Sequence, residues 1–308
     1  KIQKDLSQIK APPLTSNRRK CAICSWKNLC DSASKYEGHL REVSGIGAKR
    51  LGILKGLGIN NLQALSATNP NKLKESLGVP HGEVAHQIVQ QALVQLKKKE
   101  LRINSSEPLP ELHLAKGVLL YDIESDPDMH HDFLHGFVRV QHKIDGTWEI
   151  KESKYQPMLT LSNNAINERM IWKRLKRKLE YYIDWPILHY GETESLSLYK
   201  LAKRQNASDE ELHMIKNRCI DIHARLTKHW QLPINNYGLK SVSNFIDFKW
   251  SQEGVDGPKA LLWWRQWKSS RKSNKGYSKN LKYIYEYNKE DCLATWAIAT
   301  WLIRKYFE

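Results

Sequence analysis

Two acidic residues in the middle of the chain have a spacing that could hold a metal ion. Asp122 and Glu124 are two positions apart, directly after the apolar run 118–121. In a strand their carboxylates would point to the same face, roughly 6–7 Å apart along it. A divalent cation relieves their repulsion, and hard oxygen ligands suit Mg²⁺ or Mn²⁺. Most isolated Asp-x-Glu pairs are solvated surface, but here we expect Asp122 at the carboxyl end of a strand, where α/β sites lie.

A second acidic position lies near the end of the chain. Tyr287 and Asp291 are four residues apart, so a helix would place them on one face. Asp291 precedes the apolar residues 292–294, and a carboxylate at the start of a buried face indicates a functional role. The alternative is a helix N-terminal acid stabilised by the helix dipole.

A third acidic segment follows the apolar residues 187–190. Gly191 marks a turn, and Glu192 and Glu194 then begin a predicted helix. Either carboxylate could reach a metal. The spacing alone favours acids that stabilise the N-terminus of this helix.

Together these segments supply enough carboxylates for a phosphoryl-transfer site. Such sites use two divalent ions roughly 4 Å apart to activate a water and stabilise the leaving oxygen. Tyr287 could orient that water or help to deprotonate it. The ligand set would be Asp122, Glu124, Glu194 and Asp291.

The elements that must position these residues follow from hydrophobic periodicity. Strands are predicted over 118–124, 134–141 and 147–151, with Asp145-Gly146 as the turn between the last two. A short strand is predicted at 187–190. Helices are predicted over 163–180, 192–203, 208–229 and 287–305. Strands followed by alternating helices indicate an α/β layer fold.

A glycine-rich segment near the N-terminus predicts a phosphate contact. Gly45 and Gly47 permit a tight turn between two helices, and backbone N–H groups at the following helix N-terminus can bind a phosphate. Lys49 and Arg50 stand beside this turn. The pattern resembles a helix-hairpin-helix, which grips the nucleic-acid backbone without reading sequence, and a poorer copy begins at 77–82. A protein-interaction or purely structural helical pair is the alternative.

Three of the five cysteines, Cys21, Cys24 and Cys30, lie within ten residues. Three thiolates are one ligand short of a closed zinc site or an all-cysteine iron–sulfur cluster. An odd cysteine count suits a reducing cytoplasm better than a disulfide framework. Reduced free cysteines are the alternative.

Composition bounds the class of protein. The chain has 308 residues, is 41% hydrophobic and 27% charged, and is therefore globular. Its formal charge of +16 favours binding to phosphate polymers or anionic lipid. The alternative is that this charge only keeps the protein soluble. No apolar run approaches the roughly 18 residues of a membrane span. We expect a cysteine-cluster segment at 1–34, a helical hairpin domain at 35–98, a linker at 99–116 and the α/β domain at 117–308.

Four segments together resemble a known fold family. The segments 121–127 (YDIESDP), 189–194 (HYGETE), 237–240 (YGLK) and 287–292 (YNKEDC) look like those of the ribonuclease-H-like, DnaQ-type DEDDy exonucleases. The whole chain resembles the C-terminal portion of the RecB-like nuclease family, which joins a RecB-type nuclease domain, a cysteine cluster, helix-hairpin-helix elements and this exonuclease-like domain. The resemblance implies a mixed sheet flanked by helices, preceded by a small all-α domain, and 3′→5′ exonuclease activity on DNA or RNA.

The resemblance also implies roles for single residues. Asp122 and Glu124 would be the first-motif metal ligands, Asp291 the last-motif ligand and Tyr287 the water-orienting tyrosine. Glu194 stands where these enzymes usually have Asp, which lengthens the arm by one methylene and leaves the second metal's geometry open. Lys240 would touch the substrate backbone, unless it is simply a solvated lysine.

The cysteine cluster acquires a role from the same resemblance. Cys21, Cys24 and Cys30 would close a RecB-like nuclease domain and bind a [4Fe–4S] cluster whose fourth ligand lies upstream, outside this chain; zinc is the alternative metal. Two rival functions remain open: a non-catalytic nucleic-acid-binding module with a degenerate exonuclease fold, and an interaction scaffold in a larger repair or defence complex.

Overall fold

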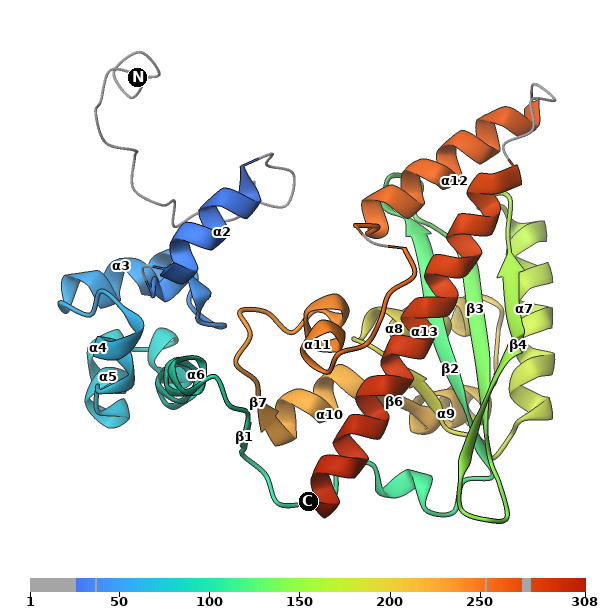
Figure 1. Cartoon of the computed structure of the whole chain (residues 1–308). Coiled ribbons are helices and arrows are strands. Elements are labelled where there is room, and N and C mark those ends of the chain that lie inside the picture. Colours follow the sequence, from blue (N-terminus) through green and yellow to red (C-terminus); the bar gives the residue numbers. More distant parts are fainter. Residues whose placement is uncertain (1–25, 37, 253, 273–277) are drawn as a thin grey trace. The chain divides into compact units, whose positions relative to one another are not determined.

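The computed structural model describes residues 26–36, 38–252, 254–272 and 278–308 (Figure 1). The chain divides into two compact units. One comprises the residues up to Asn104 together with Trp230–Tyr237, and the other comprises Ser105–His229 and Gly238–Glu308. Within the described part of the chain, no helix is long and apolar enough to cross a membrane.

The N-terminal unit is helical, as expected. Its apolar core includes the fully buried Leu40, Leu54, Leu65 and Ile88. Gly45 has φ +91°, the left-handed conformation that the predicted tight turn requires. Only a single 3₁₀ turn precedes this glycine, in place of the expected helix. The elements are α2 (Lys27–Tyr36), η2 (Leu40–Glu42), α3 (Ala48–Gly56), α4 (Leu62–Ser66), α5 (Pro70–Leu77), η3 (His81–Val84) and α6 (Ala85–Lys97).

A late segment of the chain completes this unit. Strand β1 (Leu101–Arg102) pairs antiparallel with β7 (Trp230–Gln231). The buried Gln91 side chain on α6 donates to the backbone carbonyl of Leu232 over 2.7 Å. The segment 230–237 therefore belongs with the helical unit, although the sequence placed it inside the α/β domain.

The C-terminal unit is built on a five-stranded mixed sheet in the order β4-β3-β2-β5-β6. The β2–β3 and β3–β4 pairs are antiparallel, and the β2–β5 and β5–β6 pairs are parallel. The strands are β2 (Gly117–Asp126), β3 (His131–His142), β4 (Trp148–Leu159), β5 (Ile187–His189) and β6 (Cys219–Asp221). The expected α/β fold with a mixed sheet is confirmed.

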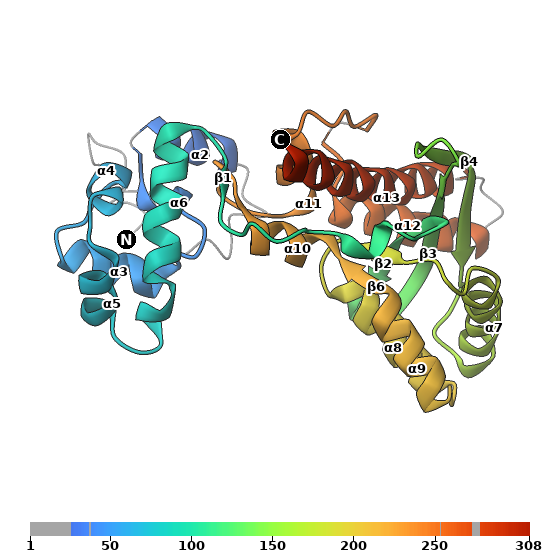
Figure 2. The same ribbon diagram turned by 90° about the horizontal axis from the view of Figure 1, so that it is seen from below.

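Helices cover both faces of this sheet (Figure 2). On one face Leu119, Tyr121 and Phe137 pack against Ile171 of α7 and Leu198 of α8. Helices α12 and α13 lie on the other face. The helices are α7 (Ala165–Tyr181), α8 (Thr193–Arg204), α9 (Asp209–Arg218), α10 (Ile222–His229), α11 (Leu239–Phe245), α12 (Gly257–Lys272) and α13 (Ser278–Phe307), with short 3₁₀ turns η4 (Pro110–Leu112) and η5 (Pro127–Met129).

Three expectations about these elements were wrong. The helix predicted over 208–229 is interrupted by β6, because Cys219–Asp221 pair with β5 and become an edge of the sheet. Strand β2 runs beyond Asp122 to Asp126, because the antiparallel pairing with β3 continues past a bulge at Glu124/Ser125. Asp122 is therefore inside a strand and not at its end. The last helix begins at Ser278, earlier than the predicted 287.

We expect Trp264→Ala to destabilise the C-terminal unit by about 3–5 kcal/mol, because a fully buried tryptophan leaves a large cavity. Trp264 on α12 is 0% exposed and stacks on Phe133 of β3 at a centroid distance of 4.3 Å. Urea unfolding followed by circular dichroism measures the change. Leu262→Ala on the same helix, where Leu262 is 46% exposed, should stay within about 0.5 kcal/mol of wild type. Equal effects of the two variants would contradict this packing.

Candidate metal centre

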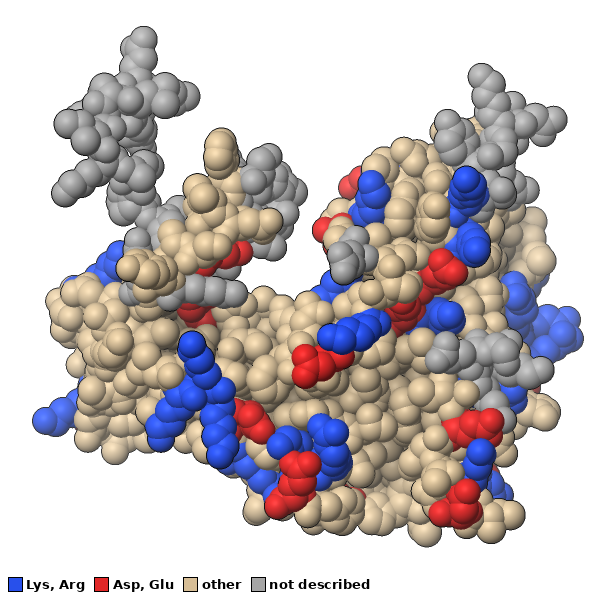
Figure 3. Space-filling model, in the orientation of Figure 1, with Lys and Arg blue, Asp and Glu red and all other residues tan. Residues whose placement is uncertain are grey.

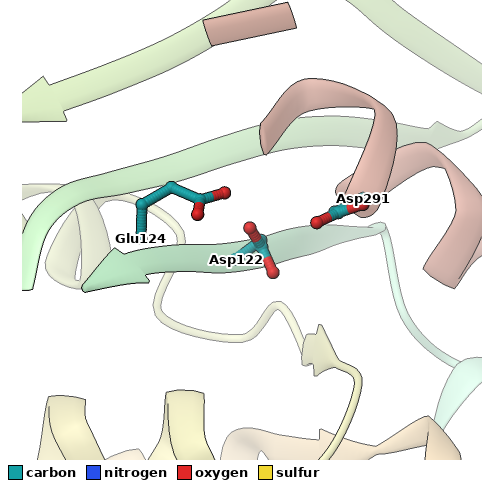
Figure 4. Close-up of side chains that lie close together, drawn as sticks. All are labelled: Asp122, Glu124 and Asp291. Carbon is teal, nitrogen blue, oxygen red and sulfur yellow. The ribbon is translucent and has the colours of Figure 1, made fainter. Parts of the chain in front are cut away.

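Three carboxylates from β2 and α13 converge on the face of the sheet that α13 covers. Leu119, Tyr121 and Ile123 alternate into the core on the opposite face, so Asp122 and Glu124 point toward α13. Asp291 of α13 meets them there, and the three carboxylates turn toward one another (Figure 4). One oxygen atom from each of Asp122, Glu124 and Asp291 lies within 4.8 Å of the other two.

The strand register explains why the site forms at this level of the sheet. The parallel neighbour β5 pairs only with Leu119 and Leu120 of β2. Beyond that point β2 and β3 continue as an antiparallel pair. Asp122 and Glu124 therefore lie just past the end of the parallel pairing. The site thus forms at the carboxyl ends of the parallel-paired segments, although β2 itself continues beyond this point.

Buried oxygen atoms without partners indicate that the cluster fits a cation. Glu124 and Asp291 are only 7% and 8% exposed. Glu124 Oε1 and Asp291 Oδ1 are buried and accept no hydrogen bond from the described residues, and the same holds for Glu194 Oε2. Unsatisfied buried carboxylates are costly unless they are paired or coordinate a metal. This donor set of hard anionic oxygens suits Mg²⁺ or Mn²⁺.

The protonation equilibria of the cluster reflect the same crowding. Burial first, and then the negative charges of Asp291 and Glu124, hold the pKa of Asp122 well above its usual range. Burial and Asp291 likewise raise the pKa of Glu124. Burial raises the pKa of Asp291 to about 7, although the ammonium of Lys240 opposes this rise.

Glu194 lies near this cluster and outside its closest set. It stands in the first turn of α8 and is 8% exposed. Burial raises the pKa of Glu194 to about 7, and its charge helps to raise the pKa of Asp122. Its Oε2 is 3.9 Å from Nδ1 of His189. Glu192, the alternative ligand, occupies the exposed N-cap position of α8.

Helix α13 brings two further side chains to the site. Hydrogen bonding by the Tyr287 hydroxyl lowers the pKa of Asp291, one helical turn later. The amide of Asn288 donates to Oδ2 of Asp122 over 2.6 Å, and its hydrogen bonding also lowers the pKa of Glu124. Burial and the nearby carboxylates raise the pKa of Tyr287, so this phenol stays protonated.

Lys240 of α11 supplies a positive charge beside the carboxylates. Its Nζ lies 5.0 Å from the ring centroids of both Trp250 and Tyr287. Its charge lowers the pKa of Asp291 and of Glu124. Lys240 is half-buried and held against aromatic rings, and it is therefore not the freely solvated lysine of the alternative interpretation.

Asp221 holds backbone groups near the site. Its carboxylate accepts hydrogen bonds from the backbone N–H groups of Gly191, His223 and Ala224 at 2.9, 2.9 and 3.2 Å. These bonds fix the turn after β5 and the start of α10. Asp221 thus holds the backbone that leads to Glu194.

The N-terminal residues that the sequence suggested as ligands for nucleic acid or metal differ from one another in exposure and contacts. Gly47 is the N-cap of α3 without a side-chain cap, and Lys49 is exposed. Arg50 donates to the backbone carbonyls of Gly45 and His81 at 2.8 and 3.3 Å, so it braces the hairpin turn. Cys30 is half-buried on α2 with a free thiol. The other two cysteines of the predicted cluster, Cys21 and Cys24, lie outside the described residues.

Sequence reasoning missed the residues that surround Asp122. Asn288 lies three positions before Asp291, and helical spacing could have assigned it to the same face. Tyr155 of β4 donates to Oδ1 of Asn288 over 2.9 Å. No local pattern marks Tyr155, because its partner is 133 residues away.

Comparison with known families identifies the class. A family model described as the RNase H superfamily matches residues 119–303, which is more than half of the chain. The chain belongs to the RNase H superfamily, and its C-terminal unit has a nuclease-type fold that contains an acidic cluster. No curated protein and no solved structure gave a significant match. The narrower resemblance to RecB-like nucleases and the helix-hairpin-helix remain predictions.

We expect Asp291→Asn to stabilise the metal-free protein at pH 8. Folding raises the pKa of Asp291, so the folded state holds the proton of this carboxyl more tightly than the unfolded state does. The free energy of unfolding therefore falls as pH rises from about 4 to about 7. Each unit of raised pKa corresponds to about 1.4 kcal/mol, and we expect a gain of about 1–3 kcal/mol. The gain should vanish near pH 4, where both proteins are neutral at this position.

Urea unfolding at the two pH values measures this difference. Mn²⁺ should stabilise the wild type and have a much smaller effect on Asp291→Asn, because one ligand is lost. Equal stabilities at pH 8, or the same response to Mn²⁺, would contradict the electrostatic account of the cluster.

Proposed function

We propose that this protein is a metal-dependent nuclease that hydrolyses phosphodiester bonds of DNA or RNA, and more narrowly a DEDDy-type 3′→5′ exonuclease. The observation that carries the proposal is the convergence of Asp122, Glu124 and Asp291, with unsatisfied buried oxygens, inside an RNase H superfamily domain. Carboxylates grouped in this way serve phosphoryl transfer in two-metal sites.

Different residues of the site would bind the metal and orient the attacking water. Asp122, Glu124 and Asp291 would hold Mg²⁺ or Mn²⁺, with Glu194 as the additional ligand for a second ion. When bound, the metal lowers the pKa of water and neutralises charge on the phosphate. Tyr287, which keeps its proton, orients the attacking water through its hydroxyl group and does not act as the base.

Lys240 adds a charge that does not depend on the metal. Its ammonium lies beside the carboxylates and against Tyr287, where it can bind a non-bridging phosphate oxygen of the substrate. A fixed cation near a developing negative charge stabilises the transition state more than the ground state. We therefore place Lys240 on the substrate side of the site.

The N-terminal unit extends the proposal to the rest of the chain. The turn at Gly45 and Gly47, with Lys49, would contact the nucleic-acid backbone as a helix-hairpin-helix does. Arg50 would stabilise this turn through its hydrogen bonds to backbone carbonyls. Cys21, Cys24 and Cys30 would belong to a [4Fe–4S] cluster completed by an upstream RecB-like nuclease domain. The domain boundaries predicted from sequence belong to the same proposal, except that the segment 230–237 joins the helical unit.

We expect Asp122→Ala and Asp291→Ala to abolish Mn²⁺-dependent release of nucleotides from a 3′-labelled oligonucleotide. Tyr287→Phe should lower kcat by about 10²-fold, since a small misplacement of the attacking water costs on this scale. Glu210→Ala on α9, which removes an exposed acid, is the matched control and should be fully active. Binding of DNA without any turnover by the wild type would favour the rival, a non-catalytic module with a degenerate fold.

Helix α7 offers a surface for the substrate backbone. Its exposed positions include Arg169, Lys173, Arg174 and Arg177, and these four form no ion pair with any residue that the structure describes. Spacings of three and four residues place them on one side of the helix. Lys and Arg gather over α7 at the right-hand edge of Figure 3. Exposed cations on one helix face suit a phosphate polymer.

We expect the triple variant Arg169→Glu, Lys173→Glu and Arg177→Glu to weaken oligonucleotide binding about tenfold or more and to lessen its salt dependence. Each lost phosphate contact lowers the slope of log K against log salt by about 0.9 on duplex DNA. Fluorescence anisotropy across a salt series measures both quantities. Lys200→Glu, Lys203→Glu and Lys216→Glu on α8 and α9 make the same charge change elsewhere. An identical loss in both triple variants would show that only net charge matters.

A further inference from the structure

Asn288 connects the carboxylate cluster to β4, an edge strand of the sheet. We propose that Asn288, oriented by Tyr155, is a positioning residue that fixes Asp122 for metal binding and so sets the affinity of the site for a divalent ion. This inference rests on the proposed function. It adds a component that neither the acidic motifs nor the superfamily assigns.

The hydrogen bonds run in one direction from β4 to β2. Tyr155 on β4 donates its hydroxyl to Oδ1 of Asn288 over 2.9 Å. Asn288 on α13 donates through Nδ2 to Oδ2 of Asp122 over 2.6 Å. Asn288 is 0% exposed, so water does not compete for these bonds. Three separate elements therefore converge on one carboxylate.

Tyr155 determines which end of the amide faces the acid. The carboxylate of Asp122 can only accept hydrogen bonds when it is ionised, so it requires the NH₂ end of Asn288. A flipped amide would place a carbonyl oxygen against the carboxylate. The phenol donor at Oδ1 removes that alternative, because the pKa of Tyr155 is raised by burial and the group keeps its proton.

Gly136 makes room for this arrangement. It lies opposite Asp122 in the β2–β3 register. A Cβ atom at this position would lie 1.6 Å from Oδ1 of Asn288 and 3.0 Å from the Tyr155 ring. Gly136 is therefore the residue that allows the amide to pass between α13 and β3, and any larger side chain would displace Asn288.

A fixed Asp122 has a direct consequence for cation binding. The amide engages Oδ2 of Asp122, and one oxygen atom of this carboxylate lies within 4.8 Å of oxygen atoms of Glu124 and Asp291. A neutral donor thus partly offsets the repulsion among the acids and holds a ligand in place before the ion arrives. Residues that orient metal ligands typically contribute 10–100-fold to metal affinity.

The test is a Mn²⁺ titration of the full chain, with free Mn²⁺ followed by electron paramagnetic resonance. Asn288→Ala should weaken Mn²⁺ binding about 10–100-fold. Gly136→Ala should reproduce this loss without removing any polar group, and Tyr155→Phe should cause a smaller loss in the same direction. The matched control is Asn280→Ala, since Asn280 is also a buried asparagine of α13 but bonds to Gln266; its Mn²⁺ affinity should equal that of wild type.

Nuclease activity gives a second readout that a merely structural role would not reproduce. In Asn288→Ala the Mn²⁺ concentration for half-maximal activity should rise, while kcat at saturating Mn²⁺ recovers most of the wild-type value. Wild-type Mn²⁺ affinity in Asn288→Ala and in Tyr155→Phe would overturn the positioning role and leave the proposed function intact. Failure of the wild type to bind Mn²⁺ at all would overturn both. Should Asn288→Ala not fold, Tyr155→Phe alone decides, because it removes a single oxygen atom.

Discussion

The repulsion among buried carboxylates is the constraint on which the C-terminal unit depends. Asp122, Glu124 and Asp291 share one small volume, with Glu194 close enough to raise the pKa values of Asp122 and Glu124. Burial of like charges opposes folding, and apolar packing on both faces of the sheet must offset it. The clusters around Phe137 and around Trp264 provide this packing. The fold therefore holds its acids in an arrangement that a bound metal ion would relieve.

Helix α13 both creates this repulsion and moderates it. Within little more than one turn it contributes the acid Asp291, the phenol of Tyr287 and the amide of Asn288. The phenol and the amide donate hydrogen bonds to the carboxylates, and Lys240 adds a positive charge from α11. The two neutral donors and the Lys240 ammonium lower the electrostatic cost of burying the carboxylates, and they do not occupy the position of a metal ion. Such a site is prepared for its ion before the ion binds.

Local patterns in the sequence predicted the parts of this site that local geometry determines. The two-residue spacing of Asp122 and Glu124 and the four-residue spacing of Tyr287 and Asp291 placed each pair on one face of its element. The mixed α/β fold also followed from the order of elements. The end of β2 was misjudged, because pairing with β3 extends the strand beyond its apolar run. Strand β6 was missed because a three-residue edge strand has no periodicity of its own.

Long-range contacts account for what the sequence could not supply. Tyr155 and Gly136 matter only through Asn288, which lies far away in the chain. The segment 230–237 joins the helical unit through hydrogen bonds to Gln91. Arg50 resembled a phosphate ligand in the linear sequence, but the fold gives it two backbone carbonyls as partners.

Anomalous diffraction from a crystal of this protein soaked in Mn²⁺ tests the central claim most directly. We expect an anomalous peak among the carboxylates of Asp122, Glu124 and Asp291, with oxygen atoms of all three in its coordination shell. Well-ordered carboxylates at high Mn²⁺ concentration with no peak between them would contradict it, as would a peak that recruits none of the three.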